Sequence, residues 1–180
     1  KVFQVNPELD CHNTLFRSYD CAMKSAGRID PSIYKTVFNG NVDAQDLEDV
    51  FAVLNFSQPV GYNGHSLSVS DIVEIEGSGC FYCDSFGFQE LKDFDTSKTE
   101  PITGYRMLVI EPHKEPYEMV IPDGLEPLQQ AVGGWIECTY PFEDNTYVIG
   151  NEEAKLIGLE GNRHINGQIY AGNLLIAGDD

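Results

Sequence analysis

The chain has 180 residues, 42% of them hydrophobic, and its 29 acidic and 11 basic residues give a formal net charge of −18. This hydrophobic fraction is ordinary for a protein with a core, so the composition excludes a wholly disordered chain. No apolar run approaches the roughly 20 residues that cross a bilayer. The acidic field repels nucleic-acid phosphates and anionic membranes and attracts basic proteins, so we predict no direct binding to nucleic acid or membrane. An acidic surface that serves solubility alone is the simpler interpretation of this charge.

The sequence divides into two parts. Residues 94–104 are rich in Thr, Ser, Asp, Pro and Gly and lack apolar periodicity, which is typical of a linker. We therefore predict an α+β protein with domains at residues 1–96 and 104–180. The first is expected to combine helices with a small antiparallel sheet, and the second to combine an antiparallel or mixed sheet with one helix.

The first part opens with an alternating run at residues 2–5 that predicts a strand. Apolar residues then recur every three or four positions and indicate a helix that ends at Ala26. Asn13 or Thr14 is its expected N-cap, and Gly27 its expected C-terminal stop.

The rest of this part should hold two more helices and then strands. The residues after an Asp-Pro pair, 33–38, favour a short helix, and a longer helix is expected from about Asp43. Alternating apolar residues predict β structure at residues 67–69, 72–75 and 80–83, with a glycine turn between the last two.

In the second part, the sequence predicts five strands and one helix. The expected strands cover residues 105–110, 117–121, 135–140, 147–149 and 169–177. The helix is expected at residues 123–132, because Asp123 and Glu126 resemble a capping box and Gly133 can end it.

Two sequences resemble known families. SLSVSD at residues 66–71 and YCDSFGF at residues 82–88, within residues 64–91, are similar to the core of YodL-like domains. Residues 107–119, 125–137, 151–163 and 167–180 are similar to a domain of unknown function common in phage, plasmid and conjugative-element proteins. These resemblances imply a cytoplasmic accessory protein of bacterial mobile DNA, and they imply no activity.

The five cysteines are an odd number with irregular spacing, which does not fit a disulfide framework, so we expect reduced, mostly buried thiols. Cys80 and Cys83 have the spacing of a metal or redox pair. Zinc requires two further ligands, however, and residues three apart on a strand point to opposite faces. We therefore predict no metal and no cofactor.

A small-ligand site is expected in the densest polar region of the second part. Its candidate binding residues are Asn151, Glu152, Lys155, Asn162 and Arg163. Asn, Lys and Arg side chains can bind an anion or a peptide carboxylate. The competing interpretation is a pair of turns in which the two bases pair with neighbouring glutamates.

No combination of residues predicts catalysis. Asp84, Ser85 and His65 could suggest a hydrolytic triad, but Ser85 lacks the strained elbow of a serine nucleophile, and a turn is the simpler interpretation. The acids from Asp43 to Asp49 could mimic DNA phosphates, although carboxylates also favour the first turn of a helix. We predict a non-enzymatic protein that binds a basic host protein. One form of this function is an antirestriction-like acidic mimic. The alternative is a small-ligand or anion-binding module.

Overall fold

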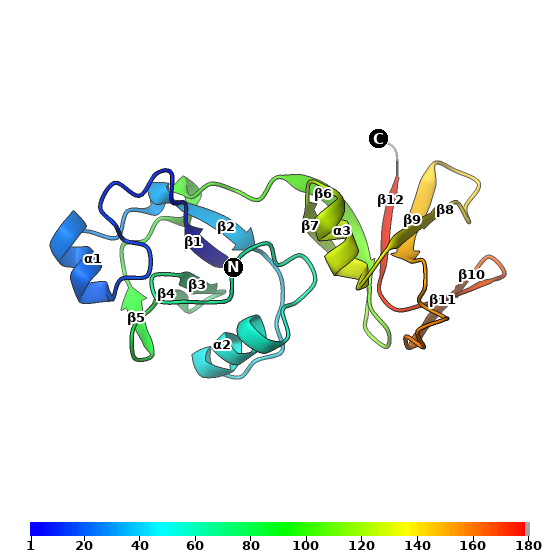
Figure 1. Cartoon of the computed structure of the whole chain (residues 1–180), viewed down its shortest axis with the longest axis horizontal. Helices are drawn as coiled ribbons and strands as arrows, with labels where there is room; N and C mark the ends of the chain where they lie inside the picture. Colours follow the sequence, from blue (N-terminus) through cyan, green and yellow to red (C-terminus); the bar gives the residue numbers. More distant parts are fainter. Residues whose placement is uncertain (179–180) are drawn as a thin grey trace. The chain divides into compact units, whose positions relative to one another are not determined.

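The computed structural model describes residues 1–178, which form two compact units. Unit 1 is Lys1–Ile102, and unit 2 begins at Thr103 (Figure 1). In the described residues, unit 1 combines two α-helices with one antiparallel sheet, and unit 2 combines one α-helix with two antiparallel sheets, so the predicted α+β class and the two-part organisation are confirmed. None of the helices in the described part of the chain has the length and hydrophobicity needed to cross a membrane.

Unit 1 is built on one five-stranded antiparallel sheet with the order β2-β1-β3-β4-β5. Its strands are β1 (Val2–Val5), β2 (Tyr34–Phe38), β3 (Ile72–Ile75), β4 (Gly79–Cys83) and β5 (Phe88–Leu91). A turn joins β3 to β4, where Gly77 (φ 75°) and Gly79 (φ 112°) adopt backbone conformations that L side chains rarely take. The predicted glycine-turn hairpin is confirmed.

Two helices cover the two faces of this sheet. Helix α1 (Tyr19–Ala26) packs its Ala22 into the cluster that contains Phe3. Helix α2 (Leu47–Phe56) lies against the other face, where Val2 and Val50 line the same groove. Neighbouring strand residues point to opposite faces, which is why Val2 and Phe3 belong to different layers.

Helix α1 starts later than the predicted Asn13 or Thr14. The carboxylate of Asp10 accepts hydrogen bonds from the backbone N–H groups of Thr14 (2.8 Å) and Leu15 (2.9 Å). Asn13 and Phe16 have positive φ values of 53° and 60°, which no α-helix allows. The predicted stop is confirmed, because Gly27 adopts the left-handed conformation (φ 74°).

Three further predictions for unit 1 are wrong. The expected helix at residues 33–38 is instead a 3-10 turn, η1 (Pro31–Ile33), followed by strand β2, since pairing with β1 outweighs the helix signal. Helix α2 begins at Leu47 instead of Asp43, because Asp46 caps it by accepting from the Asp49 N–H at 2.8 Å. Residues 67–69 are not a strand and lead into a turn in which the Asp71 N–H donates to the Ser68 carbonyl.

The segment predicted as a linker contributes to unit 1. It contains a 3-10 turn, η2 (Thr96–Lys98), and Glu100 pairs with the outer edge of β2. The Thr36 N–H donates to the Glu100 carbonyl at 2.7 Å, and the Glu100 N–H donates to the Tyr34 carbonyl at 2.9 Å. The edge of the sheet at β2 is therefore covered by the chain's own backbone, and the units divide after Ile102.

Unit 2 has a second five-stranded antiparallel sheet with the order β7-β6-β12-β9-β8 and a two-stranded hairpin, β10-β11. The strands of the sheet are β6 (Gly104–Ile110), β7 (Tyr117–Pro122), β8 (Ile136–Thr139), β9 (Thr146–Asn151) and β12 (Leu174–Gly178). The hairpin consists of β10 (Gly161–Ile165) and β11 (Gln168–Ala171).

Helix α3 (Leu125–Val132) packs against β7, β8, β9 and β12. The predicted capping box at Asp123 is wrong, since Gly124 is the N-cap and no side chain caps the helix. The expected single strand at residues 169–177 is divided into β11 and β12. Gly172 turns the chain there with φ 71°, and a Cβ at this position would lie 2.7 Å from Leu159 Cδ1.

Candidate functional site

The five residues predicted to bind a ligand do not converge on one site. Asn151, Glu152 and Lys155 line a cavity of about 260 Å³ between β9 and β11, together with residues of both strands. Asn162 and Arg163 lie on β10 and do not line this cavity. The cavity expected to contain both Lys155 and Arg163 is therefore not formed.

Asn151 is buried, and its side chain holds the C-terminus of α3. Its Nδ2 donates to the carbonyls of Gly133 (2.9 Å) and Val132 (3.4 Å), and its Oδ1 accepts from the Glu153 N–H (2.8 Å). These carbonyls lack partners within the helix. A Cβ on Gly134 would lie 2.6 Å from Asn151 Nδ2, so only glycine allows this close approach.

Asn162 and Arg163 also bond to backbone carbonyls. Asn162 Nδ2 donates to the carbonyls of Ile110 (2.7 Å) and Gly172 (2.6 Å) and so joins β10 to the end of β6 and to the turn before β12. Arg163 donates to the Lys114 carbonyl at 2.9 Å. Among residues 1–178, neither Arg163 nor Lys155 forms an ion pair. The competing prediction, in which these two bases pair with neighbouring glutamates, is therefore wrong as well.

Unit 1 contains a larger groove of about 730 Å³ beside α2. Its floor is apolar, because the buried side chains of Val2, Phe38 and Val73 from the sheet meet Val50 and Leu54 from the helix. Polar and apolar residues make up the rest of the lining. The polar ones are Lys1, Asn39, Asn41, Glu74 and Glu76, and the apolar ones include Val42, Ala44 and Ile75.

A buried polar cluster lies at the start of β3. Asp71 has no exposed surface, and its Oδ2 accepts from Gln4 Nε2 (3.0 Å) and the Ser68 N–H (2.9 Å). His65 Nδ1 lies 3.7 Å from the same oxygen. Tyr62 completes the cluster, since its hydroxyl donates to the His65 carbonyl at 2.7 Å.

Gln4 fixes the geometry of this cluster from the centre of β1. Its Oε1 accepts from the His65 N–H at 3.1 Å, and its Nε2 donates to the His65 carbonyl at 2.8 Å. Burial raises the pKa of Asp71 to about 7, against the lowering effect of the bonds from Ser68 and Gln4. The other carboxyl oxygen of Asp71, Oδ1, has no hydrogen-bond partner in the described structure.

The YCDSFGF sequence forms the turn between β4 and β5. Asp84 Oδ1 accepts from the N–H of Tyr19 (3.1 Å), the first residue of α1, and from the Ser85 N–H (2.7 Å). Gly87 closes the turn with φ 68°, and the Asp84 N–H donates to its carbonyl at 2.9 Å. Phe86 projects from the tip and is 97% exposed. The interpretation of Asp84 and Ser85 as turn residues is confirmed.

The cysteines give no sign of a metal or redox centre. All five are free, but only Cys80 and Cys83 are buried, so the expectation of mostly buried thiols is wrong. Burial raises the pKa of Cys80, and it raises that of Cys83 to about 12, which keeps both thiols protonated near neutral pH. In residues 1–178, no three His, Cys, Asp or Glu side chains are arranged to hold a metal ion.

The polar cluster was not predicted as a site. In the sequence, Asp71 stands out only as the end of the SLSVSD segment, and Gln4 only as part of the strand expected at residues 2–5. One signal for a buried polar side chain was present in the sequence. Gln4 alternates along β1 with Phe3 and Val5, which face α1, so its side chain must point to the opposite face of the sheet, and that face is also buried. A buried glutamine requires partners, and a short polar segment between apolar strands can supply them.

Comparison with known proteins agrees with the two units seen in the structure. Residues 1–94 match the YodL-like domain, and residues 105–180 match a domain of unknown function (DUF3846). The chain therefore belongs to the YodL-like family through its first unit, as the resemblance predicted. No curated protein and no solved structure matches it significantly.

Proposed function

We propose that this chain is a non-enzymatic, cytoplasmic accessory protein of bacterial mobile DNA that binds a basic protein partner. The observation that carries the proposal is the excess of carboxylates on both units. With 29 acidic and 11 basic residues, 18 carboxylates would lack a basic counterpart even if every base paired with one. Such a field speeds association with a positively charged surface and disfavours acidic competitors.

The bases are also partly engaged within the chain. Within residues 1–178, five of the 11 form ion pairs with carboxylates of their own unit. These are Lys1, Arg28, Lys98, Arg106 and Lys114. Exposed pairs of this kind add little to stability, but they reduce the positive charge available to an acidic partner.

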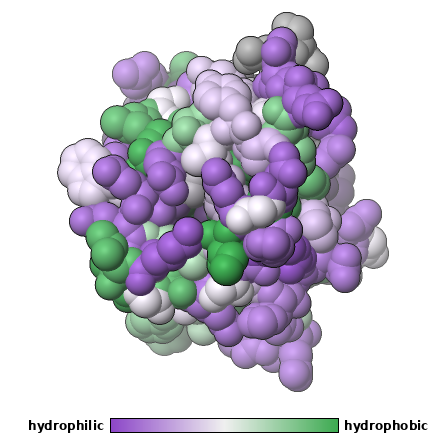
Figure 2. All heavy atoms as spheres, turned by 90° about the vertical axis from the view of Figure 1, so that its right-hand side faces the viewer, coloured by the Kyte–Doolittle hydropathy of each residue, from purple (hydrophilic) through white to green (hydrophobic). Residues whose placement is uncertain are grey.

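On the face drawn in Figure 2, hydrophilic residues dominate and hydrophobic ones are scattered between them.

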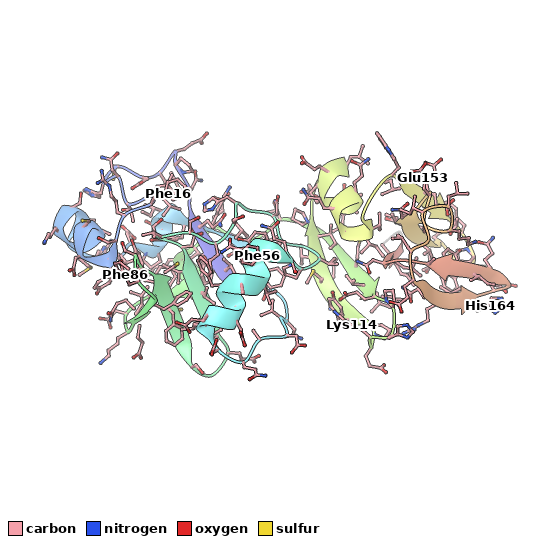
Figure 3. The ribbon with its side chains drawn as sticks, turned by 60° about the horizontal axis from the view of Figure 1, so that its bottom comes forward. Phe16, Phe56, Phe86, Lys114, Glu153 and His164 are labelled. Carbon is pink, nitrogen blue, oxygen red and sulfur yellow. The ribbon has the colours of Figure 1, made fainter. Side chains whose placement is uncertain are left out.

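Exposed aromatic side chains supply anchors for such a partner. Phe86 at the β4–β5 turn is 97% exposed, and Phe56 at the end of α2 is 85% exposed (Figure 3). Aromatic residues are enriched in protein interfaces, where a few of them contribute most of the binding energy. Neither side chain packs in the core of unit 1 in the structure of the free chain.

The setting in mobile DNA rests on the family resemblance of both units. An acidic mimic of DNA, directed at a host nuclease or DNA-binding protein, is one form of the proposed function. The acidic start of α2 does not favour that form, because Asp46 and Asp49 cap the helix. A protein with a basic surface remains the partner that the charge distribution fits best.

A small-ligand module is the second candidate. The observation in its favour is the cavity of about 260 Å³, in which Lys155 lies near Asn151 and Glu152. Calorimetric titration with small mono- and dicarboxylates tests this function. Binding that is lost in Lys155→Ala would favour it over the first candidate.

Capture from a bacterial lysate tests the first candidate. The tagged chain should retain one stoichiometric basic protein at about 0.05 M NaCl and release it at about 0.5 M, because salt screens the attraction. The matched variant carries the exposed-residue changes Glu48→Gln, Glu115→Gln and Glu143→Gln and should retain less of that protein. Recovery of no basic protein, or of one whose binding ignores salt, would contradict the proposal.

A further inference from the structure

We infer that the basic partner docks at the outer edge of strand β5. The occupant is an extended segment of that partner, which adds a strand to the sheet of unit 1 and places an apolar side chain in a cavity beside α1. The inference deepens the proposed function and rests on it. It assigns to one edge of one sheet an interaction that the net charge alone leaves unplaced.

The two edges of the sheet of unit 1 differ. At β2, the backbone of Glu100 pairs with the outer edge and covers it. At β5, no backbone group within residues 1–178 bonds to the outer edge. An uncovered edge strand presents unpaired N–H and C=O groups, which are a template for pairing with another chain. The chain therefore covers one edge of this sheet itself and leaves the other available.

The backbone bonds of β4 identify the free groups on β5. The Cys83 N–H donates to the Asp71 carbonyl at 2.8 Å, and the Cys83 carbonyl accepts from the Ser70 N–H at 3.0 Å, so both groups face β3. Phe88, which lies opposite Cys83, is therefore not hydrogen-bonded to β4. Bonded and non-bonded pairs alternate along an antiparallel ladder, so Glu90 is not bonded to β4 either. The N–H and carbonyl groups of Phe88 and Glu90 thus point away from the sheet.

These outward groups can pair with an extended segment. Within the described chain, the Glu90 carbonyl accepts one side-chain bond, from Gln89 Nε2 at 3.4 Å. This bond is long and lies on the exposed surface, so the N–H of an added strand can replace it. Addition of an extended peptide to a sheet edge is a recurring mode of recognition, in which the main chain supplies affinity and pockets for alternate side chains supply specificity.

A cavity of about 400 Å³ lies between α1 and the end of β5, which are neighbours at one end of unit 1 (Figure 1). Leu91 points to the α1 face of the sheet, because its partner Cys80 belongs to the core beneath α1. Every second side chain of an added strand falls on the same face. Five apolar residues of the lining are only partly buried and so offer surface to such a side chain. They are Tyr19, Met23, Ile29, Leu91 and Phe94.

The charges around the cavity favour an apolar side chain in it. The lining contains three basic and three acidic residues, so it has no net charge. Arg28 is already paired with Asp30 at 3.0 Å. Lys98 is already paired with Asp95 at 3.3 Å. A charged side chain would lose water in this cavity without gaining an unpaired counterion from either pair.

The edge itself favours a basic partner over a second copy of this chain. Two copies would each bring a net charge of −18 and would bring two Glu90 side chains to one edge. Like charges across a strand pair are destabilising, whereas opposite charges stabilise it. Glu90 is exposed and forms no ion pair within residues 1–178, so it is available to a Lys or Arg of the added strand. Phe86, exposed just before β5, adds an aromatic anchor beside this edge.

The test uses a synthetic peptide in which Val and Thr alternate between terminal lysines, titrated into the full chain. We expect it to bind and to slow amide hydrogen exchange at Phe88 and Glu90, whose N–H groups point outward. Exchange at Gln89 and Leu91, whose N–H groups face β4, should change little. The same peptide with N-methylated backbone amides has lost its donors and should bind about tenfold more weakly or worse.

A proline tests the backbone bond on the side of the chain. Glu90→Pro removes an N–H that the sheet does not use, so unit 1 should fold and bind the peptide about three- to tenfold more weakly. Glu90→Thr is the matched control, because it removes the same carboxylate and keeps the N–H. The proline variant should bind more weakly than the threonine variant at every salt concentration.

A second pair of variants tests the cavity and keeps the test decisive if the proline disturbs β5. Met23→Glu places a charge in the apolar lining and should weaken peptide binding about tenfold or more. Cys21→Glu adds the same charge to an exposed position of α1 that does not line the cavity, and should leave binding unchanged.

Three results would overturn the inference. They are unchanged exchange at Phe88 and Glu90 with the peptide, equal binding by the two Glu90 variants, and equal binding by the two variants of α1. Slow exchange at Phe88 and Glu90 that appears without peptide and increases with the concentration of the chain would show that a second copy occupies the edge, and would overturn it too.

The failure of this inference differs from failure of the proposed function. A basic protein captured equally by wild type and Glu90→Pro, in a salt-dependent manner, would reject the β5 edge and retain the function. If no basic protein is captured and the Val/Thr peptide does not bind, both are rejected.

Discussion

The backbone N–H of Phe16 donates a hydrogen bond to Ser70 Oγ at 2.9 Å, and both residues have positive φ values, 60° and 84°. A non-glycine residue in this region costs of order 1–3 kcal/mol and persists only when its surroundings hold it there. The ring of Phe16 lies 5.5 Å from that of His65, and Asp10 holds the preceding residues. The loop before α1 is thus held against the SLSVSD segment, next to the polar cluster.

The first prediction concerns this bond. Ser70→Ala should lower the free energy of unfolding of unit 1 by about 1–3 kcal/mol, because the Phe16 N–H loses its acceptor while the strained backbone stays. Amide hydrogen exchange of the strands β1 and β3 measures the change. Ser85→Ala removes a hydroxyl from an exposed turn and should change stability by no more than about 0.5 kcal/mol. Equal exchange rates in the two variants would contradict the assigned role of the bond.

The second prediction is a pH dependence set by Asp71. Its pKa is about 7 in the folded chain, against an ordinary value of 3.8. Between about pH 4 and pH 7 the unfolded chain has released this proton while the folded chain retains it. Stability should therefore fall as the pH rises through this window, by up to about 4 kcal/mol, and then level off.

Asp71→Asn removes this titration. The amide still offers an oxygen to Gln4 and the Ser68 N–H, so the variant should fold, and its stability should change less between pH 4 and pH 7 than that of wild type. Urea unfolding followed by hydrogen exchange of unit 1 across this range provides the measurement. Asp93→Asn, at an exposed carboxylate, is the control and should keep the wild-type pH profile. A wild-type profile in Asp71→Asn would refute the assignment.

Much of the fold follows from periodicity and turn chemistry. The β3–β4 hairpin, strand β1 and the ends of α1 and α3 at glycine could all be predicted, because short-range pattern and backbone freedom determine them. The start of α1 could not. It depends on Asp84, which caps Tyr19 across 65 positions of sequence, and no local pattern reports such a contact.

The candidate sites could be predicted less well than the fold. Polar density pointed to Asn151 and Asn162, but in both cases the side-chain amide bonds to backbone carbonyls of other elements. Asp71 lies in a turn, and it is also the buried acid of a cluster. A side-chain amide that holds the fold together differs from one that binds a ligand in its burial and in its hydrogen bonds to residues far away in the sequence. Neither property can be predicted from the spacing of residues alone.

The third prediction tests the cap on α1. Asp84→Ala removes the acceptor for the Tyr19 N–H and should destabilise the helix by about 1 kcal/mol, as loss of an N-cap does. Faster amide exchange in the first turn of α1, with little change in β1, is the expected result. Asp20→Ala in the same turn makes no such bond to the backbone and is the matched control. Slower exchange in α1 of the Asp84 variant, or no change, would rule out capping by this side chain.

The fourth prediction concerns Asn162 in unit 2. Asn162→Ala leaves the carbonyls of Ile110 and Gly172 without their donor, and each unpaired buried group costs about 1–3 kcal/mol, so a loss of about 2–4 kcal/mol in the free energy of unfolding is expected. Amide hydrogen exchange of β6 and β12 across a urea series follows the unfolding of this unit, because Trp135, the single tryptophan of the chain, is 66% exposed and reports unfolding poorly. Asn145→Ala, in an exposed turn, should shift the urea midpoint little. If Asn162 bound a ligand and did not hold the fold together, Asn162→Ala would leave the urea midpoint unchanged as well. The unfolding transition of unit 2 therefore shows whether the side-chain amide of Asn162 is structural.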